Sequence, residues 1–159
     1  MPKLSAGLLV YRLVDGEPEV LLVHPGGPYW AKKDDGAWSV PKGEHEPDEV
    51  PLEVAVREFE EEIGKMPPDP AGALSLGELH QPSGKIVSAW AVEGDIDVGD
   101  VHSNTFEMEW PPRSGRAAEF PEVDRAGWFG LEEARRKLLR GQLGFIDRLS
   151  ELLDGGPAE

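Results

Sequence analysis

The stretch that decides the fold is Gly43-Glu-His-Glu-Pro-Asp-Glu-Val-Pro-Leu-Glu-Val-Ala-Val-Arg-Glu-Phe-Glu-Glu-Glu-Ile-Gly64. Its pattern predicts a loop, then one helix, then a stop. Pro51 is tolerated in the first turn of a helix, because the amide hydrogen that proline lacks has no helical partner there. Gly64 suits the left-handed position that follows a helix, and the prolines at positions 67 and 68 prevent continuation. We therefore expect a helix that starts near Pro51 and ends at Gly64.

Two neighbouring faces of this helix carry different side chains. Glu58, Glu61 and Glu62 stand at positions i, i+3 and i+4, so they share one face. The other face is apolar and wide enough to pack against a sheet. It consists of Leu52, Ala55, Val56, Phe59 and Ile63. The segment therefore predicts a packed helix that presents three carboxylates beside the core.

The three carboxylates indicate a metal site. Like charges on one helix face repel each other, and a bound hard cation would offset that repulsion. Carboxylate oxygens suit magnesium and manganese, whereas the absence of cysteine and the scattered histidines give no indication of zinc. Magnesium is often held by a few carboxylates together with substrate phosphates. We therefore expect Mg²⁺, with Mn²⁺ as a substitute, and a polyphosphate substrate; the alternative is an acidic face exposed to solvent.

The same segment resembles the Nudix box, the signature of a family of pyrophosphate hydrolases. The family pattern is a glycine, five residues, a glutamate, seven residues, Arg-Glu, an apolar residue, any residue, Glu-Glu, any residue, a glycine and an aliphatic residue. The chain matches every position but the last, where Lys65 replaces the aliphatic residue at the end of the helix. The resemblance implies an α/β (α+β) fold of the Nudix type, an α/β/α sandwich with a mixed β-sheet.

The resemblance also implies roles for particular carboxylates. Glu58 and Glu62 are the favoured metal ligands, and Glu61 is either a ligand or the general base. Glu122 precedes the last predicted strand, in a segment similar to one from which a family glutamate reaches the metals; Glu119 is the alternative. The predicted catalytic residues are Glu58, Glu61 and Glu122. The predicted metal ligands are the Gly43 carbonyl oxygen, Glu58, Glu61, Glu62 and Glu122.

Three further residues are expected to contact the substrate. Lys42 directly precedes the box glycine and would meet a phosphate as a point charge. Tyr29 and Trp110 lie in predicted loops and are the preferred candidates for stacking on a nucleobase, worth about 1–3 kcal/mol per stack. Glu49 and Arg57, by contrast, are expected to pair with each other and hold the loop.

The rest of the chain predicts strands and two more helices around the box helix. A length of 159 residues suits one domain with a real core. We expect a single domain over residues 1–154 and a flexible C-terminal tail over 155–159. Residues 94–123 are polar and predict a long loop, functional or mobile. Strands are expected at residues 4–13, 19–24, 38–40, 73–79, 85–92 and 128–129, and helices at 131–139 and 145–153.

Composition narrows the partners and the compartment. The formal net charge of −15 repels nucleic acid polymers and anionic membranes. A small phosphate ligand is still compatible with this charge, because bound cations reverse the local field. The chain has no cysteine, which excludes disulfides and thiol catalysis, and its N-terminal apolar run is too short for a signal peptide or a membrane span. We expect a cytoplasmic monomer or homodimer.

The predicted function is a Mg²⁺-dependent pyrophosphohydrolase that acts on phosphoric anhydride bonds of a nucleoside diphosphate linked to another group. Residues 38–43, 85–90 and 128–134 loosely resemble the diadenosine tetraphosphate hydrolase branch, which favours a dinucleoside polyphosphate. Nucleoside triphosphates remain open, and so do ADP-ribose and ADP-sugars, since Pro82 lies near a proline of ADP-ribose hydrolases. The alternatives are a non-catalytic, nucleotide-sensing Nudix-like module, which usually loses a box carboxylate, and an acidic interaction protein.

Overall fold

A long apolar strand, β1 (Leu4–Val14), lies at the centre of the computed structural model, which describes residues 3–154. β1 turns directly into β2 (Glu17–Pro25), and the two pair antiparallel with Val14 opposite Glu17. Asp15 and Gly16 form the two-residue turn, and both have positive φ angles, as a hairpin of this length requires. The strands predicted at residues 4–13 and 19–24 are confirmed and form a hairpin.

The main sheet has six strands and mixed direction. Its order is β4-β5-β1-β2-β8, and β3 pairs with β1 beside this path. β1 and β5 are parallel, whereas the other pairs are antiparallel. The remaining strands of the sheet are β3 (Lys42–His45), β4 (Leu74–His80), β5 (Ile86–Glu93) and β8 (Val123–Gly130).

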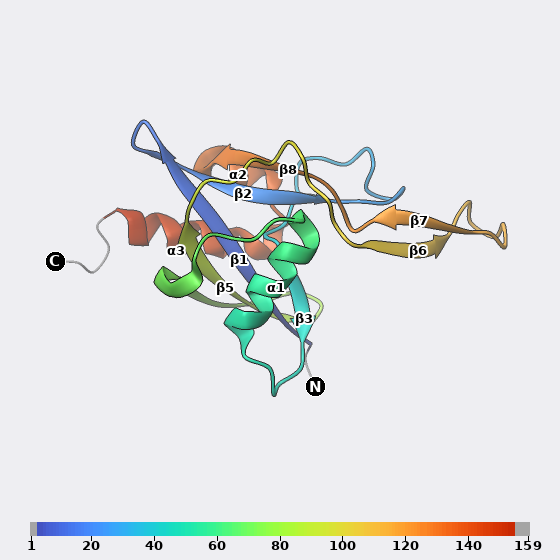
Figure 1. Cartoon of the computed structure of the whole chain (residues 1–159), viewed down its shortest axis with the longest axis horizontal. Coiled ribbons are helices and arrows are strands. Elements are labelled where there is room, and N and C mark those ends of the chain that lie inside the picture. The colour runs from blue at the N-terminus through green and yellow to red at the C-terminus, as the bar shows by residue number, and fades with distance from the viewer. Residues whose placement is uncertain (1–2, 155–159) are drawn as a thin grey trace.

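Helices cover both faces of this sheet (Figure 1). Side chains of β1 alternate between the faces, so that Leu8 and Val10 pack against one helix and Leu9 and Tyr11 against the others. Phe59 of the box helix is fully buried, which contributes about 1.5–3 kcal/mol. The predicted α/β/α sandwich is confirmed. The helices are α1 (Pro51–Ile63) on one face and α2 (Leu131–Lys137) and α3 (Leu143–Leu153) on the other, with short 3₁₀ turns at Pro70–Gly72 and Arg140–Gln142.

The box helix begins and ends where the sequence predicts. Pro51 is its first residue, and Gly64 follows it with a φ of 81°, in the left-handed region. The backbone N–H groups of His102 and Asn104 donate to the carbonyl oxygens of Ile63 and Glu61 at 3.0 and 2.9 Å. The segment after β5 therefore satisfies carbonyls that the helix end would leave without partners.

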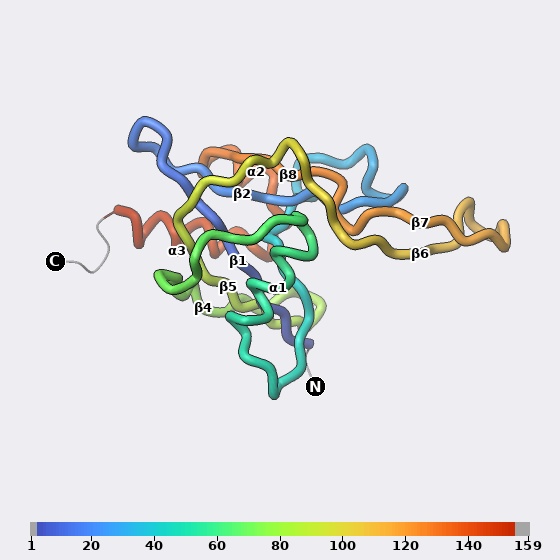
Figure 2. Tube along the Cα trace, in the orientation of Figure 1, coloured from blue at the N-terminus to red at the C-terminus, as the bar shows by residue number. Residues whose placement is uncertain are grey.

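The predicted long loop at 94–123 is wrong in its second half. That part forms a hairpin of β6 (Thr105–Glu109) and β7 (Ala117–Pro121), which projects from the main sheet (Figures 1 and 2). We call this hairpin the arm. Half-buried and exposed residues alternate along both strands, as in strands with one covered face, and in β6 this follows the alternation of apolar Phe106 and Met108 with acidic residues.

Two smaller predictions also need correction. Residues 38–40 form no strand of the sheet; Trp38 and Ser39 make only isolated bridges to Leu138 and Val23. The strand comes slightly later, in β3, because Pro41 lacks the amide hydrogen that a continuous ladder needs. The helix predicted at 131–139 ends at Lys137. The predicted tail, 155–159, lies outside the described residues, and no helix within residues 3–154 is both long and apolar enough to cross a membrane.

Candidate active site

β3 and α1 bring Gly43 against the carboxylate of Glu58. Gly43 lies opposite Ala6 of β1, and α1 packs over these strands. The Glu58 side chain is only 18% exposed. A Cβ atom at Gly43 would overlap the Glu58 carboxyl group. Glycine is therefore the residue that leaves room for this carboxylate beside the backbone of β3.

We expect Gly43→Ala to lower kcat by about 10²-fold. The added methyl group would overlap the Glu58 carboxyl group and displace it, and a displacement of about 1 Å in an active site can cost about 10²-fold in rate. The melting temperature should change much less than the activity. Gly72→Ala is the matched control, since a Cβ there meets no atom within 4 Å. Steady-state kinetics on both variants check the prediction, and wild-type turnover in Gly43→Ala would contradict it.

Four carboxylates near the contact between Gly43 and Glu58 interact electrostatically. Burial is the largest cause of the raised pKa of Glu58, Glu62 and Glu122. For Glu62 the pKa rises to about 8, and the charges of Glu58 and Glu122 add to the increase, whereas Lys42 opposes it. Glu61 raises the pKa of both Glu58 and Glu122. We call Glu58, Glu61, Glu62 and Glu122 the carboxylate group.

Lys42 begins β3 and lies beside this group. It lines a cavity of about 200 Å³ together with Glu62 and Glu122. Burial is the main cause that lowers the pKa of Lys42, and Lys85 adds to it, whereas Glu62 opposes the change most strongly. The position places a cationic side chain within the carboxylate site, as contact with a phosphate would require.

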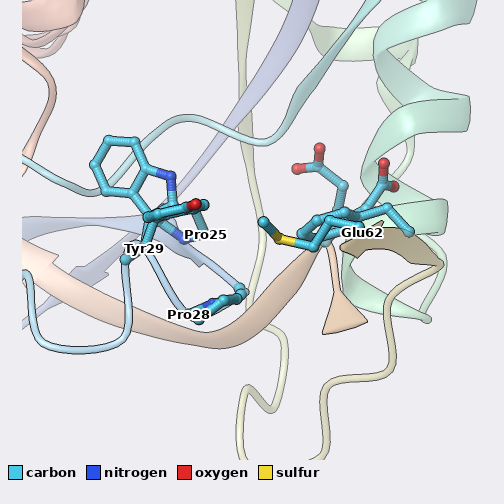
Figure 3. A pocket seen from close by; sticks show the side chains of 10 residues that line it. Pro25, Pro28, Tyr29 and Glu62 are labelled. Carbon is cyan, nitrogen blue, oxygen red and sulfur yellow. The ribbon is translucent and has the colours of Figure 1, made fainter. Parts of the chain in front are cut away.

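A second cavity, of about 490 Å³, adjoins the same carboxylates. It is lined by residues 25–30 after β2, by Phe106 and Met108 of the arm, and by Glu62 and Glu122. Figure 3 shows Pro25, Pro28 and Tyr29 on one side and Glu62 of α1 on the other. The volume lies in the range of small-molecule sites. A mostly apolar cavity therefore includes two carboxylates in its lining.

Three backbone hydrogen bonds join the segments that form this site. Asn104 N–H donates to the Glu61 carbonyl of α1 at 2.9 Å, and Glu122 N–H donates to the Asn104 carbonyl at 2.8 Å. Gly26 N–H then donates to the Glu122 carbonyl at 3.0 Å. We call this series the backbone relay. It fixes the base of the arm and the loop after β2 relative to the box helix.

Glu122 and its alternative, Glu119, differ in their position relative to the two cavities. Glu122 stands at the junction of β7 and β8 and lines both cavities. Glu119 lies within the arm, where its carboxylate accepts a hydrogen bond from Thr105 Oγ1 at 2.7 Å, and lines neither cavity. Of these two carboxylates, Glu122 is therefore the one that lines the cavities.

Other predicted residues lie outside the two cavities. Arg57 Nη1 donates to Glu49 Oε2 at 3.3 Å, and Glu49 also accepts a hydrogen bond from the backbone of Glu46, which is the main reason for its lowered pKa. This pairing holds the loop before α1. Trp110 does not line the larger cavity but packs edge to face on Tyr29, with ring centroids 5.4 Å apart.

Three residues of the larger cavity, Trp30, Phe106 and Met108, are not among the predicted substrate contacts, and Trp30 also lines the smaller cavity. The alternation in Phe106-Glu-Met-Glu-Trp110 was the available signal. It is short and lies in a polar segment, so periodicity alone gave little contrast.

The donors suit a hard divalent cation. All of the candidate side-chain ligands are carboxylates, and burial opposes the ionisation of Glu58, Glu62 and Glu122 unless a positive charge is near. Gly43 also exposes backbone next to Glu58, where a side chain would block approach. Within residues 3–154, no three carboxylate or imidazole groups already converge as a complete metal site. The chemistry of the donor set fits a divalent ion, although the side chains must adjust to share one.

Comparison with known proteins gives the family and supports the fold. A family model described as the NUDIX domain matches residues 1–149. A C. elegans Ap4A hydrolase in a binary complex is 24% identical, with 96% of this chain and 98% of that chain covered and a TM-score of 0.66. The NUDIX domain of Shewanella oneidensis NrtR, complexed with ADP ribose, is 17% identical over 96% and 89%, with a TM-score of 0.66. A MutT protein from Methanosarcina mazei Go1 is 22% identical over 95% of both chains, with a TM-score of 0.58. No curated protein matches the chain.

The chain belongs to the Nudix family. The family prediction and the predicted enzyme class, a Nudix pyrophosphohydrolase, are confirmed by this membership. Nudix enzymes generally use divalent metal ions. The solved structures share the fold, and their ligands are properties of those proteins.

Proposed function

We propose that the protein is a Mg²⁺-dependent pyrophosphohydrolase that cleaves a nucleoside diphosphate linked to another moiety. The observation that carries this proposal is that Glu62 and Glu122 line both an aromatic cavity and a cavity that holds Lys42. A nucleotide needs such a combination, since its base is apolar on its faces and its phosphates need cations. The strongly acidic protein is proposed to act in the cytoplasm, as a monomer or homodimer, on small substrates.

The proposed metal ligands are the Gly43 carbonyl oxygen, Glu58, Glu61, Glu62 and Glu122. When bound, Mg²⁺ would polarise the diphosphate and lower the pKa of the attacking water. Glu58, Glu61 and Glu122 are the candidates to accept the proton of that water, because each belongs to the carboxylate group.

The remaining proposed roles concern substrate binding. Lys42 would bind a phosphate oxygen, because it is the cationic side chain that lines the smaller cavity. Tyr29 and Trp110 would border the base, with Tyr29 in the cavity wall and Trp110 supporting it from the arm. These assignments divide the site into a phosphate side and a base side.

Dinucleoside polyphosphates are the favoured substrates, followed by nucleoside triphosphates, with ADP-ribose and ADP-sugars as further candidates. The sequence likeness to the diadenosine tetraphosphate hydrolase branch supports this order, and so does the similarity in fold to the C. elegans Ap4A hydrolase. The similarity in fold to the NrtR domain, which was complexed with ADP ribose, supports ADP-ribose and ADP-sugars as further candidates. The alternative function is a binding module without turnover. The substrate panel described next distinguishes it from the enzyme.

The test is chromatographic quantification of the nucleotide products formed from diadenosine tetraphosphate, ATP, ADP-ribose and an ADP-sugar, each with Mg²⁺ and with EDTA. We expect turnover with Mg²⁺ only, highest for diadenosine tetraphosphate. Binding of these compounds without turnover of any of them would overturn the proposed enzyme and favour the binding module. Equal turnover in EDTA would overturn the metal requirement.

We expect Glu122→Gln to lower kcat more than it weakens substrate binding, by about 10²-fold or more, because a base or metal ligand acts mainly on the chemical step. Glu119→Gln is the matched control on β7 and should change kcat little, since its carboxylate bonds to Thr105. Steady-state kinetics on both variants give the answer. The reverse order of effects would transfer the role to Glu119.

A further inference from the structure

The arm has an apolar face that needs a partner. Along β6, the half-buried Phe106 and Met108 alternate with the exposed Glu107 and Glu109. Alternate side chains of a strand point to opposite faces, so the two apolar residues share one face. A two-stranded hairpin has no core of its own and is marginally stable when isolated. The apolar face therefore needs something to cover it.

The loop after β2 covers part of this face. A Cβ atom at Gly27 would stand 3.0 Å from Phe106 Cζ, and Gly27 has a φ of 98°, so glycine permits both the close approach and the backbone conformation. Tyr29 and Trp110 make a second contact between loop and arm. The contact is incomplete, because the cavity of about 490 Å³ remains between them.

The lining of the cavity has two chemically different parts. Phe106 and Met108 offer an aromatic ring and a polarisable thioether without strong hydrogen-bonding groups. Glu62 and Glu122 supply two carboxylates to the same lining and belong to the carboxylate group. A nucleotide whose diphosphate lies at the carboxylates would place its base against the apolar part of the lining, to which the arm contributes. The reverse orientation would leave phosphates against apolar side chains, which is costly.

We propose that Phe106 and Met108 form the nucleobase-binding wall of the active site, so that the arm is a substrate-recognition element. This inference rests on the proposed function, since it takes the substrate to be a nucleotide. The base would stack against Phe106, and Met108 would fill the space beside it. Continuity of the cavity with Glu62 and Glu122 identifies the base of the cleaved nucleotide as the occupant.

The experiment compares Phe106→Ala, Met108→Ala and the control Glu107→Ala, which changes the exposed face of the same strand. KM and kcat are measured with diadenosine tetraphosphate and with 5-phosphoribosyl diphosphate, which carries a diphosphate but no base. We expect Phe106→Ala to raise KM for the dinucleotide about tenfold, as the loss of one stacking contact predicts. Turnover number should stay within about threefold, because binding rather than chemistry is affected.

The base-free compound separates recognition from folding. Where the wild-type protein cleaves 5-phosphoribosyl diphosphate, Phe106→Ala should cleave it at a rate within about threefold of wild type. If Phe106→Ala unfolds, Met108→Ala and Phe106→Leu, which keeps most of the volume but removes the ring, provide the test. The inference is overturned if these variants match Glu107→Ala with the dinucleotide, or if kcat falls equally for both compounds. No nucleotide turnover by the wild-type protein would instead overturn the proposed function itself.

Discussion

Glu62→Gln should lose activity by on the order of 10³-fold, because it removes one charge from the part of the site that both cavities share. The substitution keeps the size of the side chain, so the fold should survive. Glu62 is a proposed metal ligand, and a neutral amide binds a hard divalent cation less well than a carboxylate does. Formation of the nucleotide products at saturating Mg²⁺ measures the effect.

The matched control is Glu60→Gln, which makes the same chemical change on the exposed side of the same helix. We expect it to keep near wild-type activity. Circular dichroism and thermal unfolding of both variants separate loss of chemistry from loss of fold. Full activity of Glu62→Gln at saturating Mg²⁺ would remove Glu62 from the metal site.

In the metal-free protein, the free energy of unfolding should fall as the pH rises from 5.5 to 8. The pKa of Glu62 is 4.5 in its ordinary state and about 8 in the folded protein. Between these values the folded state binds more protons than the unfolded state, so stability is highest near the lower pH and is lost toward the folded pKa. Burial and the neighbouring carboxylates cause this loss, and Glu58 and Glu122, whose pKa values are also raised, act in the same direction.

Urea unfolding in EDTA at the two pH values measures this effect. Between pH 5.5 and 8, the free energy of unfolding of the wild type should fall by about 1–3 kcal/mol more than that of Glu62→Gln. All other titrating groups are common to the two proteins. The comparison isolates Glu62 from the many acidic residues of the chain. Equal losses in the two proteins would show that Glu62 ionises in the folded state as easily as in the unfolded state.

Much of the fold follows from local patterns in the sequence. Pro51 and Gly64 define the box helix, because each suits one end of a helix and is unfavourable inside it. The turn at Asp15-Gly16 predicts the first hairpin for a similar reason. The shared face of Glu58, Glu61 and Glu62 depends only on helical spacing. These features could be predicted, since neighbours in the sequence determine them.

The base side of the candidate site could not be predicted in this way. Phe106 and Gly27 are far apart in the sequence, and their contact depends on how the arm folds over the loop after β2. The arm itself is short and gains only a half-buried face, so its apolar pattern is weak. Trp38 shows the opposite difficulty. The sequence of residues 38–40 looks like a strand, but Trp38 and Ser39 make only isolated bridges, and Pro41 interrupts the ladder after them. Tertiary packing decided the first case, and Pro41 decided the second.

The backbone relay has a consequence for engineering. All three of its hydrogen bonds involve residues outside the strands of the arm, since Asn104 precedes β6 and Glu122 follows β7. Side chains in the arm take no part in these bonds. The arm is therefore a module that can be exchanged between Asn104 and Glu122 while the hydrolytic centre keeps its attachment to the sheet. Grafting hairpins of other sequence at this place would offer a route to enzymes with one chemistry and many substrates.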